Sequence, residues 1–248
     1  MQNVEEKILI SRIQDLCKQA SRGNVVVSDF LDLRQQELAS LVINYIKNTN
    51  FDYFFYGGFS EAERKRLIIS PQWQENPDNL IKCIEIKPIG KNGYLEHRDY
   101  LGALLNLGIK REKLGDIVIQ NGSAYLFVDS LLVDYIIINL TKVKKLTVRL
   151  QQFFGEFEYI NPGKKYIKTT IPSLRLDAVV SAAFNMPRSD SSRLISGEYV
   201  KVNQKTIIKN SHIVNEKDLI SVRGKGRVTV EELGGITRKN RHHVLLSL

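Results

Sequence analysis

Six short segments between residues 79 and 151 follow an order that few folds accommodate. The first, third, fourth and sixth segments have the apolar, β-branched character of strands, whereas the second and fifth have apolar residues at helical spacing. The Asn121-Gly122 pair is typical of a tight hairpin turn. We therefore predict a βαββαβ domain, in which two helices back a four-stranded antiparallel sheet. The segments are IKCIEIKP, HRDYLGALLNLG, LGDIVIQNG, SAYLFVDS, SLLVDYIIIN and KVKKLTVRLQ.

This topology hosts many functions, including the common RNA-recognition fold, so topology alone does not establish binding. In that fold, aromatic side chains on the two central strands stack on bases. Tyr125 and Phe127 alternate onto one face of the expected third strand, but the first strand offers no aromatic residue. We therefore interpret this pair as core packing.

The first 70 or so residues have mostly helical patterns. An amphipathic opening helix extends to about Arg22, and the apolar spacing within residues 28–48 predicts a longer one, capped by Asp29 or Ser28. The aromatic run FDYFFYGG at residues 51–58 has the character of a strand closed by two glycines.

A dense basic run follows these elements. Ser60 and Glu63 have the spacing of a capping box, which predicts a short helix that carries Arg64, Lys65 and Arg66. Acidic neighbours favour a solvated helix face here rather than a binding site. A second group of cations lies on the last expected central strand and is the better candidate for widening an RNA contact; it consists of Lys142, Lys144 and Lys145.

Two helices and a corner are expected after residue 172. The segment 153–172 lacks a regular pattern, and we interpret it as a linker. Ser173 is a good cap for a helix whose apolar residues follow i, i+3, i+4, i+7 spacing from Leu176. Pro187 interrupts this pattern, and a second short helix is expected from about Ser189, with Gly197 ending it.

Strands are expected beyond this corner. The segment YVKVNQKTIIK alternates apolar and polar residues and is expected to turn near Asn203-Gln204. The segment DLISVRGKGRV supplies a further strand that ends in a basic, glycine-spaced loop. Together these elements predict an α+β protein whose last part is a small, separate α+β domain.

The charge of the chain is concentrated in its last third. Residues 1–163 hold 20 basic and 20 acidic side chains, a net charge of zero, whereas residues 164–248 hold 16 and 7, a net charge of +9. A localised positive field of this kind suits polyanion binding, because contacts with phosphates release condensed counterions. Charge alone also fits a basic domain that is merely soluble.

The last third resembles the S-four RNA-binding domain, named for ribosomal small-subunit protein four. The resemblance rests on RLDAVV, PRSDSSRLISGEYVKVNQK and VNEKDLISVRGKGR, in which many residues keep fixed offsets over about fifty positions. The chain departs from the usual pattern at Pro187, Ser191 and Gln204, and Asp190 adds a negative charge at the corner. Because Asn203 tolerates positive φ, the turn should survive without the usual glycine.

The resemblance and the charge pattern together indicate an RNA-binding surface. Exposed amides at the start of the second helix would bind phosphate, and cations on the helix and strands would extend the site. Arg175 and Asp177 are expected to hold the domain together as a pair. The candidate RNA-binding residues are Arg188, Ser189, Arg193, Lys201, Asn203, Lys205, Arg223, Lys225 and Arg227.

The remainder of the chain resembles the YlmH family of bacterial and plastid proteins. The likeness rests on SDFLDLRQQELASLV, GGFSEAERKRLIISP and LEHRDYLGALLNLGIKREKLGDI. It implies an N-terminal region at 1–75, a central domain like the RNA-recognition fold at 76–155 and an S-four domain with a C-terminal extension at 173–248. It also implies a non-catalytic role on ribosomal RNA and tRNA, on large ribosomal subunits obstructed by peptidyl-tRNA in ribosome-associated quality control.

An RNA-modifying enzyme, or its accessory subunit, is the alternative, because S-four domains are often joined to such enzymes. A pseudouridine synthase would need threonine and glycine after its catalytic aspartate, but Arg175-Leu176-Asp177 is followed by AVVSA. No glycine-rich methyltransferase loop is present either. His97-Arg98-Asp99 mimics a kinase catalytic loop without its partner motifs. We expect these three residues to open a helix, and we expect no catalytic residues, cofactor or metal site.

The remaining features indicate a cytoplasmic protein with no membrane span. The apolar run at residues 131–140 is about half the length that crosses a bilayer. The N-terminus lacks the pattern of a secretory leader. Cys17 and Cys83 lie far apart without a metal-binding pattern, so we expect two buried free thiols. We expect a monomer.

Overall fold

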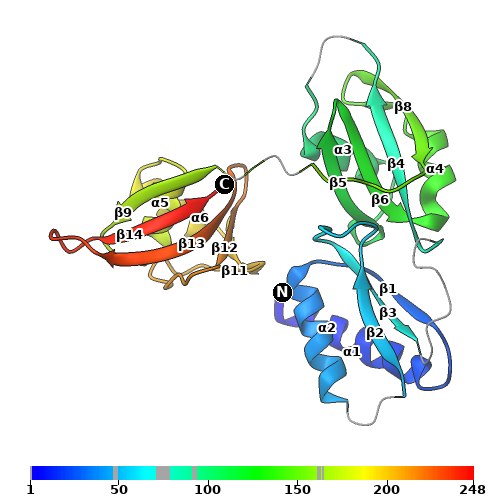
Figure 1. Cartoon of the computed structure of the whole chain (residues 1–248), viewed down its shortest axis with the longest axis horizontal. Helices are drawn as coiled ribbons and strands as arrows, with labels where there is room; N and C mark the ends of the chain where they lie inside the picture. The colour runs from blue at the N-terminus through cyan, green and yellow to red at the C-terminus, as the bar shows by residue number, and fades with distance from the viewer. Residues whose placement is uncertain (1, 47–49, 71–78, 91–93, 161–162, 164) are drawn as a thin grey trace. The chain divides into compact units, whose positions relative to one another are not determined.

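The computed structural model describes residues 2–46, 50–70, 79–90, 94–160, 163 and 165–248. The chain is an α+β protein that divides into two compact units, Met1–Ile160 and Asn161–Leu248 (Figure 1). Within the described residues, no helix has both the length and the apolar character needed to cross a membrane. Each unit is considered by itself.

The first unit opens with two helices packed on a small antiparallel sheet whose strand order is β1-β3-β2. Ile13, Cys17, Ala39 and Ile43 from the helices and Leu67 from the sheet belong to one buried cluster. This part is therefore a helix-on-sheet layer and is less helical than the sequence suggested. Its elements are α1 (Gln2–Ala20), β1 (Val26–Leu31), α2 (Leu33–Tyr45), β2 (Asp52–Tyr56) and β3 (Lys65–Ser70).

Helix α2 begins later than the sequence suggested. The cap is Asp32 rather than Asp29 or Ser28: its carboxylate accepts from the Gln35 N–H at 2.9 Å, and the Gln35 side chain accepts from the Asp32 N–H at 2.9 Å. The preceding residues form strand β1, because a run of valines prefers the extended backbone.

The predicted helix after Ser60 is also wrong. Residues 65–70 form strand β3, which lies between β1 and β2. The basic run therefore does not cover a solvated helix face. Arg66 is 8% exposed, and the Arg64 side chain donates to three backbone carbonyl groups.

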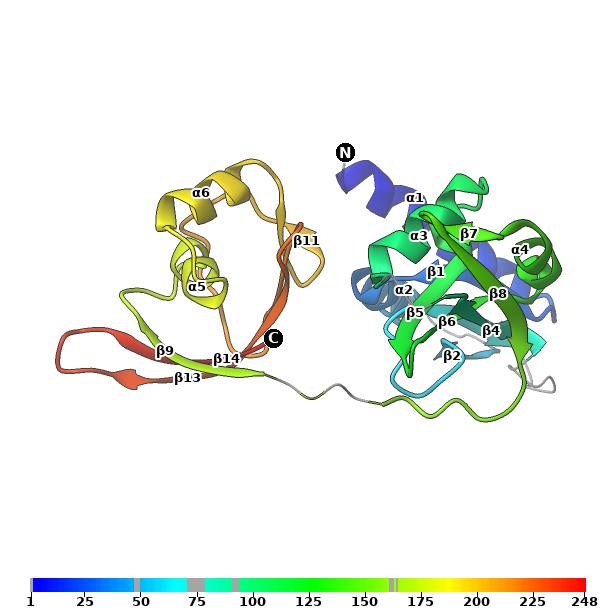
Figure 2. The ribbon, with the colours of Figure 1, turned by 90° about the horizontal axis from the view of Figure 1, so that it is seen from above.

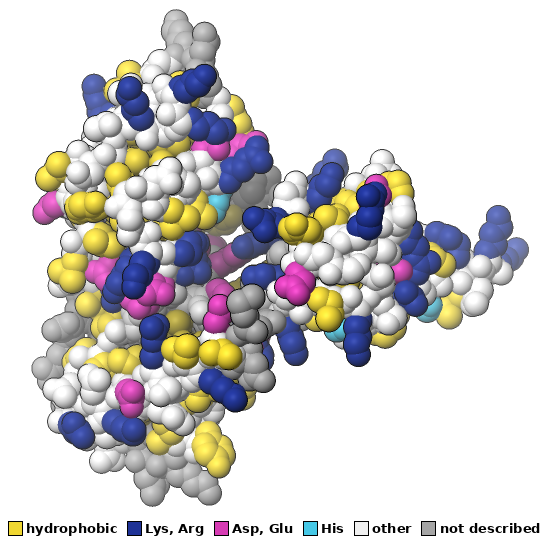
Figure 3. Space-filling model, turned by 180° about the vertical axis from the view of Figure 1, so that it is seen from behind, with side chains coloured by type: hydrophobic (Ala, Val, Ile, Leu, Met, Phe, Trp, Pro, Cys, Tyr) yellow, Lys and Arg dark blue, Asp and Glu magenta, His cyan; other side chains and the backbone are white. Residues whose placement is uncertain are grey.

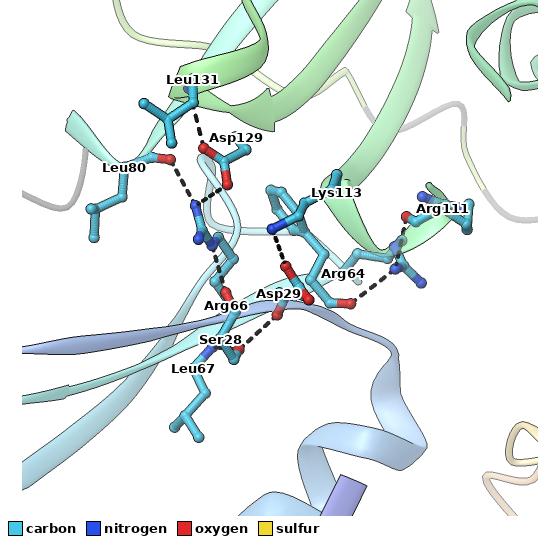
Figure 4. A network of polar contacts seen from close by, with 11 residues as sticks. Ser28, Asp29, Arg64, Arg66, Leu67, Leu80, Arg111, Lys113, Asp129 and Leu131 are labelled. Atoms are coloured by element: carbon cyan, nitrogen blue, oxygen red, sulfur yellow. Dashed lines mark hydrogen bonds and ion pairs between the residues drawn. The ribbon is translucent and has the colours of Figure 1, made fainter. Parts of the chain in front are cut away.

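These two arginines connect the first sheet to the elements that follow it (Figure 4). Arg66 donates to the Ser28 carbonyl at 2.7 Å and the Leu80 carbonyl at 3.1 Å, and lies 3.2 Å from the Asp129 carboxylate. Lys113 pairs with Asp29 at 2.6 Å across the same boundary. The first unit is thus held together by buried and half-buried cations.

The central part of the first unit confirms the predicted βαββαβ order. Its sheet has the order β5-β6-β4-β8-β7, and every pairing is antiparallel. The two-residue β7 adds an edge to the four expected strands. Asn121 and Gly122 adopt φ of 52° and 78°, as the predicted hairpin turn requires. The elements are β4 (Ile81–Pro88), α3 (His97–Asn106), β5 (Leu114–Gln120), β6 (Ser123–Asp129), α4 (Val133–Asn139), β7 (Lys142–Val143) and β8 (Leu146–Phe153), with single turns of 3-10 helix at Arg111–Lys113 and Ser130–Leu132.

The second unit places helices α5 and α6 against one antiparallel sheet of order β11-β10-β12-β13-β14-β9 (Figure 2). Leu176, Val179 and Val180 from α5 pack with buried valines and leucines of the strands. The elements are β9 (Tyr166–Ile171), α5 (Leu176–Ala183), α6 (Arg188–Ser196), β10 (Val200–Val202), β11 (Lys205–Thr206), β12 (Leu219–Val222), β13 (Gly226–Ile236) and β14 (His242–Ser247).

Three features of this unit differ from the sequence expectation. Part of the segment interpreted as a linker is β9, which pairs with β14 along its whole length. Helix α5 starts at Leu176, so its N-cap is Arg175 and not Ser173. At the end of α6 the left-handed residue is Glu198, with φ of 64°, whereas Gly197 has φ of −81°. Gly197 is needed for space, because a Cβ atom there would lie 2.9 Å from the Tyr199 ring.

Candidate nucleic-acid interface

The buried carboxylate of Asp177 organises the corner between α5 and α6. It accepts from Arg175 at 3.1 and 3.2 Å, from Arg188 at 3.0 and 3.1 Å, and from the Ala178 N–H at 2.9 Å. Burial alone would raise the pKa of Asp177, but hydrogen bonds from the two guanidinium groups outweigh it and lower that pKa. The expected Arg175–Asp177 pair is therefore present, and it also includes Arg188.

This arrangement weakens the anion site that was expected at the start of α6. Arg188 is shared with Asp177, and Arg193 forms an ion pair with Asp190 on the same helix. Ser189 is exposed in the first turn, where helix N–H groups lack partners within the helix. The corner thus offers exposed amides, but carboxylates already neutralise both arginines.

Asn203 shapes the β10–β11 turn. Asn203 and Gln204 have φ of 48° and 64°, so the turn keeps its left-handed geometry without the usual glycine. The Asn203 side chain donates to the Asp218 carboxylate at 2.8 Å and accepts from the Leu219 N–H at 2.9 Å. Lys205 follows the turn and is exposed. In this structure Asn203 positions neighbouring residues and uses its own amide to do so.

Lys201 and Arg227 lie on one face of the second sheet. In the strand register, Lys201 is opposite Ser221 and Ser221 is opposite Arg227. Residues opposite one another project from the same face, so these two cations flank the Ser221 hydroxyl roughly 10 Å apart. The alternate residues, such as Val200 and Val202, are buried. Lys201 and Arg227 are therefore on the solvent side.

The β12–β13 turn carries two more exposed cations, Arg223 and Lys225. Gly224 and Gly226 adopt φ of 77° and 120°, a geometry that glycine supplies without strain. No ion-pair partner is present among the described residues for Lys201, Lys205 or Lys225. On the visible face of this unit, lysine and arginine side chains outnumber acidic ones (Figure 3). These strand and turn cations are the candidate anion-binding surface of the unit.

Tyr199 belongs to this surface, although the sequence reasoning did not select it. The residue is 44% exposed, and the Arg223 guanidinium lies 5.7 Å from the centroid of its ring. An exposed aromatic ring among cations is a common base-stacking element in RNA-binding proteins. The sequence signal for Tyr199 is its position between the end of a helix and a strand that carries Lys201.

Aromatic side chains cover the face of the central sheet that helices α3 and α4 do not cover. Phe127 is 2% exposed and lies 4.5 Å from Phe59 and 5.0 Å from Phe157, measured between ring centroids. Tyr125 packs on Phe157 at 5.1 Å and on Phe153 at 5.4 Å. The interpretation as core packing is therefore confirmed for Phe127, whereas Tyr125 is half-buried and packs against the same aromatic cluster.

Of the three lysines near β7, one forms an ion pair among the described residues. Lys144 lies 2.8 Å from Asp99, which opens α3 as expected and accepts from the Glu96 N–H at 2.9 Å. The hydrogen bonds from Lys144 and Glu96 lower the pKa of Asp99. Lys142 and Lys145 are exposed. In the described ranges, no three histidine, cysteine, aspartate or glutamate side chains gather as metal ligands would.

Comparisons with known proteins assign the chain to a family. Residues 5–74 match the family model described as "YlmH, N-terminal", and residues 75–155 match "Putative RNA-binding domain in YlmH". The chain is 33% identical over 221 residues to "Ribosome-associated protein quality control protein P2" of Bacillus subtilis (strain 168). The matched region covers 88% of this chain and 85% of the relative.

A solved structure supports the fold. The chain is similar to the structure titled "Cell division protein ylmH from Streptococcus pneumoniae", with a TM-score of 0.51 and 22% identity. The similarity covers 60% of this chain and 92% of that one. Two family models on consecutive segments and a relative matched over most of both sequences lead to one conclusion: this chain belongs to the YlmH family.

Proposed function

We propose that this chain is a non-enzymatic RNA-binding protein that acts on the large ribosomal subunit. It contacts ribosomal RNA, and tRNA where a peptidyl-tRNA obstructs the subunit, in ribosome-associated quality control. The description of the Bacillus subtilis relative as a ribosome-associated quality control protein and that of the central family model as a putative RNA-binding domain support this proposal. The protein acts in the cytoplasm as a monomer and needs no cofactor. Its proposed domains are residues 1–75, 76–155 and 173–248.

The observation that carries the proposal is the uncompensated charge of the second unit. Residues 164–248 hold the whole net charge of +9, and Lys201, Lys205, Arg223 and Lys225 are exposed on strands β10 and β11 and on the β12–β13 turn. Such a field attracts RNA from solution, and each cation placed at a phosphate adds counterion release to the binding free energy.

The candidate residues have different roles within this proposal. Lys201, Lys205, Arg223, Lys225 and Arg227 contact RNA phosphates, and Tyr199 stacks on an unpaired base. The backbone N–H groups of Arg188 and Ser189 donate to the oxygens of one further phosphate. Asp177 holds Arg188 in place through its hydrogen bonds, and Asn203 holds the β10–β11 turn in place through its hydrogen bonds to Asp218 and Leu219.

Sedimentation with ribosomal subunits tests the proposal. We expect the purified full chain to move with large subunits in a sucrose gradient at low salt, and a Lys201→Ala/Arg223→Ala/Lys225→Ala variant to stay largely at the top. The matched control is Lys7→Ala/Arg12→Ala/Arg22→Ala, which removes three exposed cations from and near α1 and should sediment like wild type.

Two results would overturn the proposal. The ribosomal role fails if the wild-type chain stays at the top of the gradient at every salt concentration. The non-enzymatic role fails if RNA recovered from the sedimenting fraction contains a modified nucleoside, by mass spectrometry, that depends on the added protein. That second result would favour an RNA-modifying enzyme.

A further inference from the structure

The hairpin β13–β14 extends well beyond the surface described above. Strand β13 has 11 residues, but β12 pairs only with Gly226 to Thr229. Beyond that point β13 pairs with β14, and β14 pairs with β9. The turn at residues 237–241 projects past the end of β9 (Figures 1 and 2).

The apex of the hairpin is held in one geometry by its own hydrogen bonds. The Thr237 N–H donates to the Arg241 carbonyl at 2.7 Å, the Asn240 N–H to the Thr237 carbonyl at 2.9 Å, and the Arg241 N–H to the Thr237 hydroxyl at 3.1 Å. The Arg241 guanidinium donates to the Thr170 hydroxyl at 3.0 Å and to the Thr170 carbonyl, which fixes the apex to β9. The turn is therefore preorganised, and binding would cost little ordering entropy.

Two cations at this apex point into solvent. Arg238 and Lys239 are exposed, and neither has an ion-pair partner among the described residues. No acidic residue follows Glu232 in the sequence, so nothing in the hairpin turn neutralises them. The two side chains therefore contribute neither to core packing nor to an ion pair among the described residues.

We propose that this apex is a second RNA-binding site, at which Arg238 and Lys239 contact phosphates of the RNA backbone. This inference rests on the proposed function. The apex offers two cations and the exposed Asn240 amide but no aromatic ring, a set of groups that suits phosphate and ribose rather than base stacking. The RNA contacted is therefore recognised here by its backbone and not by its sequence.

The apex is too far from the first surface to share its phosphates. Lys225 directly precedes β13 and the apex directly follows it, so the 11 residues of the strand separate them by up to about 33 Å. Even half of this length is well above the Debye length of about 8 Å at physiological ionic strength. The two sites therefore act on different stretches of RNA, and binding at both multiplies their affinities.

Site-specific crosslinking tests this inference. Single substitutions Lys225→Cys, Lys239→Cys and, as control, Gln14→Cys on the exposed face of α1 would carry a photoreactive azide. The introduced thiol is the reactive one, because Cys17 and Cys83 are 2% and 9% exposed and burial raises the pKa of Cys83 to about 12. The probes are purified large ribosomal subunits and their protein-free RNA.

We expect crosslinks to RNA from positions 225 and 239, at separate nucleotides, and none from position 14. If position 225 crosslinks to RNA and position 239 does not, or if position 239 reaches only ribosomal protein, the second site is overturned and the proposed function stands. If neither position crosslinks and the wild-type chain does not bind, the proposed function fails, and this inference with it.

The salt dependence of binding gives an independent measurement. For an Arg238→Ala/Lys239→Ala variant on protein-free RNA, the slope of log K against log salt should flatten by about 1.4 to 1.8, which is 0.7 to 0.9 for each lost phosphate contact. The control Lys7→Ala/Arg12→Ala should keep the wild-type slope. An unchanged slope for the apex variant, with wild type bound, overturns the second site.

Discussion

Single residues decide whether a charge is used inside the fold or presented to a ligand. Arg188 matches the S-four pattern, yet its guanidinium is bound to Asp177. Lys201 and Lys225, by contrast, face solvent without ion-pair partners among the described residues. Sequence spacing placed all three in the right domain. It did not show which of them a carboxylate would engage, because that depends on contacts between segments far apart in the chain.

The buried Asp177 carboxylate yields a stability prediction with a pH dependence. Asp177→Asn removes the charge that three donors share, so the free energy of unfolding at pH 7 should fall by about 2 kcal/mol. Because the folded state lowers the pKa of Asp177, its contribution is present above the unfolded pKa of about 3.9 and is lost as pH falls through the lower folded value. Wild type and variant should therefore converge at low pH.

Urea unfolding followed by circular dichroism at pH 7 and pH 3 measures this difference. Asp190→Asn is the control, because the Asp190–Arg193 pair is mostly exposed and should contribute less than about 1 kcal/mol. A gap between wild type and Asp177→Asn that stays constant between the two pH values would contradict the assigned role of the carboxylate.

At the scale of elements, the sequence predicted what local periodicity and turn chemistry determine. The βαββαβ order was predicted correctly because each segment shows its own period and Asn121-Gly122 fixes a turn. Strands β3 and β9 were missed because their partners determine them. β3 lies between two strands and places charged Arg66 in a buried position, and β9 pairs with β14, more than seventy residues later in the chain. No local pattern contains that information.

The Arg66 network should stabilise the first unit strongly. Arg66→Leu leaves the Asp129 carboxylate buried without its cation and removes one hydrogen bond each from the Ser28 and Leu80 carbonyl groups, so we expect a loss of about 3–5 kcal/mol in the free energy of unfolding. Lys65→Leu, one residue away on the same strand and half exposed, should change it by less than about 1 kcal/mol. Equal effects of the two substitutions in thermal or urea unfolding would contradict this account of the strand.

At the scale of the whole molecule, charge and chemistry are divided between the two units. The first unit has no net charge over residues 1–163, uses Arg64 and Arg66 in internal contacts and covers its sheet face with its own aromatic side chains. The second unit carries the entire net charge of +9 and exposes it. Composition was sufficient to locate this division. The hairpin apex and the Tyr199–Arg223 contact could be found only once the strands were paired.

The salt dependence of RNA binding tests the central claim most directly. Full-length wild type, Lys201→Ala/Arg223→Ala/Lys225→Ala and the α1 control Lys7→Ala/Arg12→Ala/Arg22→Ala would each be titrated with protein-free large-subunit RNA over a range of salt concentrations. The account predicts that the first variant flattens the slope of log K against log salt by about 2.1 to 2.7 and that the control keeps the wild-type slope. Equal slopes for the two variants would contradict it.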